Sequence, residues 1–155
     1  MKGLMSPYQL TLPHLFDRAE KLFASKEIAT ATRGGIERTT YGEWAQRTRR
    51  LAGALDALGI SADGRVGTFA WNTARHLELY FAAPCSGRVL HTLNIRLFPE
   101  DITYIADHAE DEVVFADRSL LKLLWPLVDG FKTVKHVVVM DDGDDCELQI
   151  GRAHV

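Results

Sequence analysis

The sequence has little cysteine and no long hydrophobic run. Only Cys85 and Cys146 are cysteines among 155 residues, and they lack a CxxC spacing. This pattern excludes a disulfide-rich secreted scaffold and a zinc motif, so both residues are expected to be reduced thiols. No apolar run approaches the roughly 20 residues that span a bilayer, and the N-terminus MKGLMSPYQL has no signal-peptide core. We therefore expect a cytoplasmic protein with no transmembrane segment.

Excess positive charge and the familiar catalytic motifs are also absent. The chain has 18 Lys and Arg against 21 Asp and Glu, a net charge of -3, which argues against a nucleic-acid partner. It contains no GxGxxG, no Walker loop and no nucleophile elbow. Motifs alone therefore indicate no self-sufficient catalytic apparatus.

What the chain does have is a regular alternation of β-prone and helical stretches. Short β-prone runs occur at residues 66–70, 89–93, 113–116 and 137–140, about two dozen residues apart. Each interval contains a helical stretch, and connections of that kind join parallel strands. The expected fold class is α/β, with a largely parallel, doubly wound sheet and flanking helices.

A helix–hairpin–helix segment is expected before the sheet. Residues 12–23 place their apolar side chains on one helical face. Arg33-Gly34-Gly35 separates two β-prone runs and predicts a hairpin, because paired positive-φ positions favour glycine. Thr40-Tyr41-Gly42-Glu43 has the pattern of a capping box that opens a long helix, and Gly59 ends it.

Three more helices are expected between the strands. One is capped at Asn72 and Thr73 and carries Leu77, Tyr80 and Phe81 on one face. The second begins at Pro99 and ends near residue 108. The third is capped by Ser119 and stops at Asp129-Gly130.

Several polar residues have structural rather than catalytic interpretations. His76, His91 and His108 show no metal-ligand spacing, so structural or surface roles are expected. The acidic run at residues 141–145 resembles part of a calcium loop but lacks its terminal Glu, which favours a solvated loop. The charged run formed by Arg47, Arg49 and Arg50 is interpreted as the solvated face of a helix.

Four stretches in order resemble the N-terminal region of AMP-forming acyl-CoA synthetases, the adenylate-forming superfamily. They are TTYGE at 39–43, GRVGT at 64–68 with Asn72, GRVLHTLNIRL at 87–97 and ITYIADHAED at 102–111. The last two, with RHLE at 75–78 and VKHVVVM at 134–140, are most similar to the medium- and long-chain fatty-acid–CoA ligases. Residues 1–148 are accordingly expected to be the N-terminal part of an AMP-binding domain.

The resemblance implies a reaction and its cofactors. Such enzymes activate a fatty acid with ATP and Mg²⁺ to an acyl-adenylate and transfer the acyl group to coenzyme A. Homodimers and peripheral membrane association are also possible for the family. The family's phosphate loop, Mg²⁺ ligand and C-terminal catalytic Lys belong to later segments. We therefore assign no catalytic residue and no metal ligand here, and we expect the chain alone to be inactive.

One residue is a candidate cofactor contact. Asn94-Ile95-Arg96-Leu97 matches an Asn-x-Arg-Leu motif whose Arg, in related ligases, touches the nucleotide phosphate of coenzyme A. A guanidinium suits a phosphate because it stays charged and forms paired hydrogen bonds. The alternative is that Arg96 pairs with a carboxylate of the following helix, Glu100 or Asp101.

Residues 149–155, QIGRAHV, do not resemble the family. They can be encoded by CAG ATC GGA AGA GCA CAC GTC, which after its first bases is the start of a common sequencing adapter. A non-native tail is expected, and a natural variable terminus is the alternative.

A second hypothesis for the whole chain is a stand-alone flavodoxin-like α/β binding or regulatory module. The genomic reading frame distinguishes the two hypotheses. If the chain is part of a ligase, the frame continues past Leu148; if it is a stand-alone module, a stop codon lies near Val155.

Overall fold

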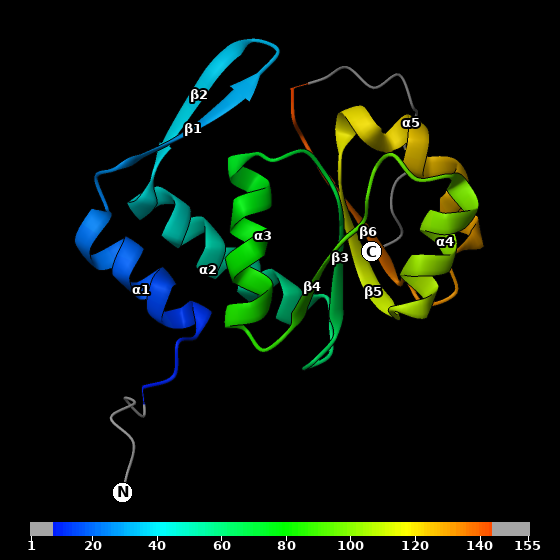
Figure 1. The fold of residues 1–155 in the computed structure, drawn as a ribbon, viewed down its shortest axis with the longest axis horizontal. Helices are drawn as coiled ribbons and strands as arrows, with labels where there is room; N and C mark the ends of the chain where they lie inside the picture. The colour runs from blue at the N-terminus through cyan, green and yellow to red at the C-terminus, as the bar shows by residue number, and fades with distance from the viewer. Residues whose placement is uncertain (1–7, 144–155) are drawn as a thin grey trace, which may run out of the picture.

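The computed structural model describes residues 8–143. Its elements form two units, a helix–hairpin–helix unit and a sheet unit (Figure 1). The first contains α1 (Leu12–Phe23), β1 (Glu27–Thr32), β2 (Gly35–Thr40) and α2 (Tyr41–Ala57). The second contains β3 (Arg65–Phe69), α3 (Ala74–Cys85), β4 (Val89–Thr92), α4 (Pro99–His108), β5 (Asp111–Asp117), η1 (Arg118–Leu120), α5 (Leu121–Leu124), η2 (Trp125–Gly130) and β6 (His136–Met140).

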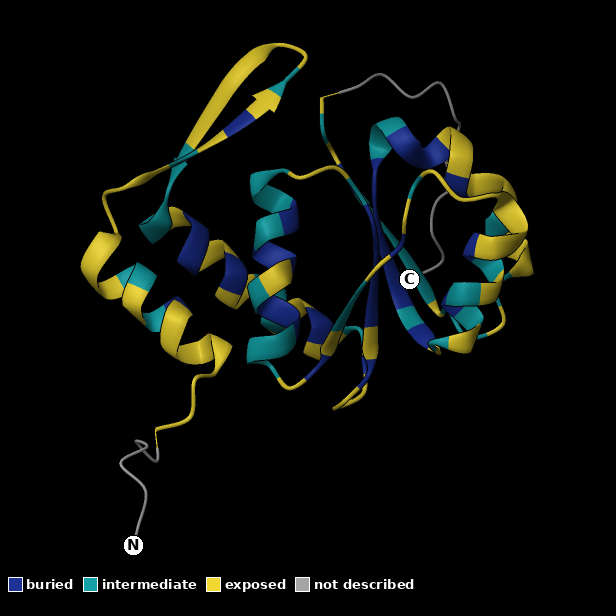
Figure 2. Ribbon diagram, viewed as in Figure 1, coloured by how far each residue is buried: buried dark blue, intermediate teal, exposed yellow. Residues whose placement is uncertain are grey.

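The sheet unit confirms the predicted α/β class. Its four strands are all parallel, in the order β4-β3-β5-β6. Successive residues of β5 face opposite sides. Val113 and Phe115 pack with α2 and α3, while Val114 and Ala116 pack with α4 and α5. The central strands are therefore buried on both faces (Figure 2), as a doubly wound sheet requires.

The local signals at the start of the chain are confirmed, with one correction. Thr40 and Glu43 form the capping box of α2, and Gly59 adopts φ +70° just after the helix ends. The hairpin joins β1 to β2 in antiparallel register. Among Arg33, Gly34 and Gly35, only Gly35 has a positive φ, of +128°, and it already pairs with Thr32. The predicted pair of positive-φ glycines is therefore wrong, because the turn itself consists of Arg33 and Gly34.

Helix α3 packs on two sides, which the single predicted face did not anticipate. Thr73 caps it through the amide of His76, as expected. Leu79 and Ala83 pack against the sheet, whereas Leu77 and Phe81 pack against the cluster of α1 and α2. Tyr80 is 42% exposed, and its ring lies 4.9 Å from the ring of His76.

The predicted helix after β5 is interrupted. Ser119 lies inside η1 rather than at a helix cap, and only four residues of α5 are α-helical before η2 begins. Pro126 near the start of η2 has no N–H to donate, which ends the α-helical hydrogen bonding there. Leu120, Leu121 and Leu124 are nevertheless buried against the sheet.

Candidate functional site

The carboxyl ends of the four parallel strands lie at one edge of the sheet, and the segments leaving them form the candidate site. Trp71 follows β3, the loop 94–97 follows β4, and Asp117 is the last residue of β5. Strands β3 and β5 are neighbours, but their following helices cover opposite faces. Ligands of open α/β sheets bind at such a switch point, so the position fits a binding role.

Arg96 lies in the loop after β4, with its side chain exposed. Its backbone N–H donates to the Asn94 Oδ1 at 3.0 Å, which fixes the turn that presents it. Within the described residues, neither Glu100 nor Asp101 forms an ion pair with its guanidinium. The loop therefore presents an uncompensated cation at the carboxyl end of β4, which is an arrangement able to hold a phosphate.

A hydrogen-bond network ties the ends of β3, β5 and β6 together. The Trp71 N–H donates to the Asp117 Oδ2 at 2.7 Å, and its indole Nε1 donates to the Ser119 Oγ at 3.0 Å. The Ser119 N–H in turn donates to Asp142 at 3.3 Å. Burial raises the pKa of the Asp117 carboxyl, and the neighbouring Asp142 raises it further, while the Trp71 amide and Arg75 oppose the shift. The network therefore joins the segments that follow β3, β5 and β6.

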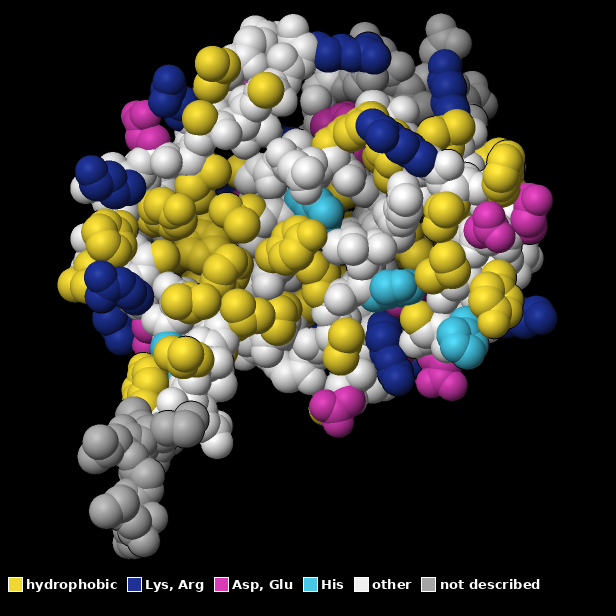
Figure 3. All heavy atoms as spheres, viewed as in Figure 1, with side chains coloured by type: hydrophobic (Ala, Val, Ile, Leu, Met, Phe, Trp, Pro, Cys, Tyr) yellow, Lys and Arg dark blue, Asp and Glu magenta, His cyan; other side chains and the backbone are white. Residues whose placement is uncertain are grey.

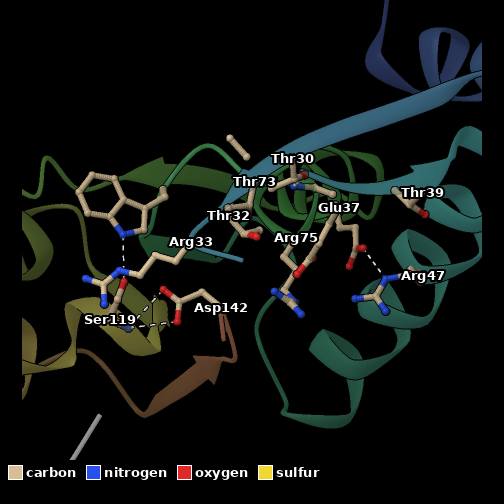
Figure 4. A pocket seen from close by; sticks show the side chains of 14 residues that line it. Thr30, Thr32, Arg33, Glu37, Thr39, Arg47, Thr73, Arg75, Ser119 and Asp142 are labelled. Carbon is tan, nitrogen blue, oxygen red and sulfur yellow. Dashed lines mark hydrogen bonds and ion pairs between the residues drawn. The ribbon is translucent and has the colours of Figure 1, made fainter. Parts of the chain in front are cut away.

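A cavity of about 470 Å³ lies beside this network, under the β1–β2 hairpin. Figure 4 shows Ser119 and Asp142 at one end, Arg47 at the other and Arg75 between them. Three guanidinium groups and three carboxylates line it: Arg33, Arg47, Arg75, Glu37, Glu78 and Asp142. Because these charges balance, the cavity shows no preference for an anion. Arg96 is not among its lining residues.

The Arg47–Arg50 run lies on an exposed face of α2, as predicted, and two of its arginines also form ion pairs with neighbouring helices. Arg47 Nε donates to the Glu78 Oε1 at 2.5 Å, and Glu78 belongs to α3 and is 6% exposed. Arg49 pairs with Glu20 of α1 and covers the Phe16 ring at 4.9 Å. Two of the three arginines therefore join α2 to neighbouring helices while keeping part of each side chain in water.

The three histidines have the structural or surface positions that were predicted. His76 is buried, with Nε2 3.0 Å from the Thr68 hydroxyl and Nδ1 3.1 Å from the Trp71 carbonyl oxygen. Desolvation lowers the His76 pKa, because burial disfavours the charged ring, and the contact with the Trp71 carbonyl opposes this shift. His91 contacts the fully buried Asp111 carboxylate at 2.9 Å, and burial raises the Asp111 pKa. His108 stacks on Tyr104 at the surface.

The remaining candidates are the two cysteines and the acidic run at residues 141–145. Cys85 is a free, half-buried thiol, and Cys146 lies outside the described residues. Within residues 8–143, no group of three His, Cys, Asp or Glu side chains could hold a metal ion. The acidic run is described only to residue 143, where the Gly143 N–H donates to Asp141. None of the helices in this part of the chain has the length and apolar character needed to cross a bilayer.

Sequence reasoning missed the residues that organise this edge. Trp71 and Asp117 were not singled out, Ser119 was considered only as a helix cap, and Arg75 and Glu78 entered only as part of a motif. One signal was available, because Trp71 and Asp117 stand at the ends of predicted strands. Their contacts join residues 46 and 48 positions apart, which a local pattern does not reveal.

Comparison with known proteins shows the family. A model described as "AMP-binding enzyme" matches residues 16–153. Because this match spans most of the chain, the chain belongs to the AMP-binding enzyme family. The match also reaches into the predicted tail, so a boundary at residue 148 stays a prediction.

Individual relatives make the likeness more specific. The long-chain-fatty-acid–CoA ligase of Thermus thermophilus is 48% identical over 139 residues, which are 89% of this chain and 26% of that protein. The 3-methylmercaptopropionyl-CoA ligase of Ruegeria lacuscaerulensis is 42% identical over 150 residues, which are 96% and 28% of the two chains. The resemblance to fatty-acid–CoA ligases is confirmed, and the chain spans about a quarter of these relatives' length.

A solved structure supports the fold. The crystal structure of an anthranilate CoA ligase in complex with anthranoyl-AMP matches with a TM-score of 0.76 at 20% identity. The match covers 87% of this chain and 26% of that one. At this identity the likeness concerns the fold alone.

Proposed function

We propose that this chain is the N-terminal part of an ATP-dependent, AMP-forming ligase that joins a fatty acid to coenzyme A. The observation that carries the proposal is the 48% identity, over most of the chain, to a ligase of that name. In the reaction the carboxylate attacks the α-phosphate of ATP, and pyrophosphate leaves. The coenzyme A thiol then displaces AMP from the acyl-adenylate. A homodimer, a cytoplasmic location and peripheral membrane association stay predictions.

Arg96 is proposed to contact a phosphate of coenzyme A. Three features support this role: its place at the carboxyl end of β4, its exposed side chain and the absence of an ion pair within the described residues. ATP, Mg²⁺ and the acyl chain are expected to contact segments of the relatives that this chain does not cover. Within residues 8–143 the residues therefore fit coenzyme A better than Mg²⁺.

The test uses the full reading frame, cloned from intact genomic DNA. In that protein, Arg96→Ala is expected to raise KM for coenzyme A about 10- to 100-fold, since a charged hydrogen bond is worth ~1.5–3 kcal/mol. ATP-dependent adenylate formation, followed as pyrophosphate release without coenzyme A, should stay nearly unchanged. Arg50→Ala is the control, and an unchanged KM in the Arg96 variant contradicts the contact.

The chain alone is expected to be inactive. Stabilising the charge that develops at the α-phosphate needs donors held in place before reaction, which is usually the largest catalytic contribution. The assay incubates the 155-residue chain with ATP, Mg²⁺, coenzyme A and fatty acids of several lengths. Turnover that follows the protein through purification would place an active site within this chain.

A further inference from the structure

A polar contact joins β4 to β5 across the strand that separates them. His91 lies in β4 and Asp111 begins β5, and β3 runs between these strands. The His91 Nδ1 lies 2.9 Å from each carboxylate oxygen of Asp111. Because neighbouring strands are about 4.8 Å apart, β4 and β5 are separated by roughly 9.5 Å, and their side chains meet only by reaching over β3.

Gly67 of β3 makes room for this contact. It pairs with His91 in the parallel register, so it lies beneath the two side chains. A Cβ atom at this position would lie 3.0 Å from the Asp111 Oδ2 and 3.1 Å from the Val114 Cγ2, which is tighter than side chains normally pack. Any other residue would therefore press on the carboxylate. We call His91, Gly67 and Asp111 the sheet bridge.

The two ionisable groups of the sheet bridge differ in their contact with water. Asp111 is fully buried, whereas the His91 side chain is 24% exposed. Figure 3 shows histidine side chains reaching the surface over the sheet unit, among charged side chains of both signs. A proton therefore enters or leaves the sheet bridge through His91. Burial raises the pKa of the Asp111 carboxyl, and the hydrogen bond and charge of His91 oppose this shift.

The charges around the sheet bridge leave its balance to its own two groups. Arg65 of β3 lowers the Asp111 pKa, but this guanidinium is 44% exposed and lies 3.6 Å from the Glu110 carboxylate. His136 lies in β6, on the other side of β5 from His91. Ionisable side chains of the neighbouring segments have contacts of their own: Glu112 with Lys135, Asp107 with the Lys132 amide, and His108 with the Tyr104 ring.

Strand β4 is the element that the sheet bridge holds. It lies at the edge of the sheet, with β3 as its only strand partner in the described part of the chain. The Val89 N–H donates to the Gly64 carbonyl oxygen at 3.0 Å, and the Leu93 N–H donates to the Thr68 carbonyl oxygen at 2.9 Å. The loop that carries Arg96 follows directly, so the position of β4 determines where this loop begins.

We propose that the sheet bridge is a pH-sensitive clamp on β4. With a proton shared between His91 and Asp111, the pair carries no net charge and ties the edge strand to β5. When that proton passes through His91 to water, a negative charge is left in a site that excludes water, and β4 loosens. The proposal goes beyond the ligase function, and its test needs no catalytic activity.

The test measures amide hydrogen exchange in the 155-residue chain between about pH 4 and pH 8, expressed as protection relative to an unstructured amide. Protection of the Leu93 N–H should fall by up to about tenfold per pH unit as the pH rises above 3.8 through the raised pKa of Asp111, because β4 then opens with loss of one proton. Amides that join β5 to β6 are the internal control, and their protection should change less.

Three variants separate the clamp from general effects of pH. Asp111→Asn keeps an oxygen that accepts from His91 but does not ionise, so Leu93 should follow the control amides at every pH. Gly67→Ala should lower the protection of Leu93 about fivefold or more at every pH, because its methyl group presses on the carboxylate. His108→Gln is the matched control, since His108 lies outside the sheet bridge, and it should keep the full response.

Each possible result decides the proposal. Equal pH responses of Leu93 and of the β5–β6 amides in the unmodified chain overturn it, and so does a response that Asp111→Asn retains. If that variant fails to fold, the NMR signals of the His91 ring in the unmodified chain decide instead. Ring signals that change over the same pH range as the Leu93 protection support the clamp, and ring signals that stay constant over that range overturn it.

Discussion

The two units of the molecule bury their hydrophobic side chains to different extents. In the sheet unit, Val66, Val113 and Val114 are completely buried, because helices cover both faces of the sheet. In the helix–hairpin–helix unit, the hydrophobic cluster has only three buried members, Phe16, Trp44 and Ala45, and β2 has none. Leu55 of α2 belongs to one of the sheet clusters, so the first unit helps to close the core of the sheet unit, while α3 completes the first unit's own cluster.

The contact between α3 and the first unit consists of apolar packing and one ion pair. Leu77 and Phe81 of α3 complete the first unit's cluster, and Phe81 meets the Trp44 ring edge-on at 5.0 Å. Arg47 and Glu78 join the same two helices beside it. Helix α3 therefore packs against both units, since its other side contacts the sheet. The following predictions test this division.

The largest difference is expected between a substitution in the core of the sheet unit and one on the exposed side of α1. Phe69→Ala removes a fully buried ring from the sheet core and should lower the free energy of unfolding by about 3–5 kcal/mol. Leu22→Ala on the exposed side of α1 should change it by less than about 0.5 kcal/mol. Urea denaturation measures both. Similar losses in the two variants would show that α1 is covered in solution.

A smaller effect is expected at the ion pair between the units. Arg47→Ala leaves the nearly buried Glu78 carboxylate without its partner and should cost about 1–3 kcal/mol. The control is Arg38→Ala, since Arg38 and Glu27 are both 56% exposed in the side chain and such pairs are worth less than about 1 kcal/mol. Equal losses for the two variants would mean that the Arg47–Glu78 contact does not join the units.

The pH dependence of the sheet edge gives a third, smaller test. The Asp117 pKa is raised above its ordinary value of 3.8 by burial, so ionisation disfavours the folded state. Asp117→Asn keeps an oxygen that accepts from the Trp71 N–H but does not ionise. The stability of the variant relative to the unmodified chain should therefore increase as the pH rises from 3.8 through the raised pKa, and stay constant above it.

Unfolding measured at several pH values checks this. A stability difference that does not change with pH, or one that falls as the pH rises, would contradict the raised pKa. His91→Gln is a useful control, because it changes a different polar pair, with Asp111, and should not alter the Asp117 response.

Sequence reasoning succeeded where the determinants are local. The four β-prone runs became β3 to β6, and the capping box of Thr40 and Glu43 formed as predicted, because spacing and caps act within a few residues. It failed where tertiary packing decides. Tyr80 shares a helical face with Phe81, but it is 42% exposed, whereas Phe81 packs against Trp44.

Part of the candidate site could likewise be predicted from the sequence, and part could not. Arg96 was found from its motif, and its role with coenzyme A stays a prediction. The network of Trp71, Asp117 and Ser119 depends on strand order, which places β5 beside β3 although β4 lies between them in sequence. Helical spacing likewise showed Arg47 on the surface but gave no sign of its partner in α3.

The smallest effect is expected from the last seven residues. Each buried member of the three hydrophobic clusters in the described part of the chain lies between Phe16 and Met140. The motifs that resemble the family likewise end at Met140, although the family match extends to residue 153. Deleting residues 149–155 should therefore change the free energy of unfolding by less than about 1 kcal/mol, with an unchanged dependence on urea concentration. A larger loss would show that residues 149–155 make native contacts, and it would contradict the interpretation of QIGRAHV as a non-native tail.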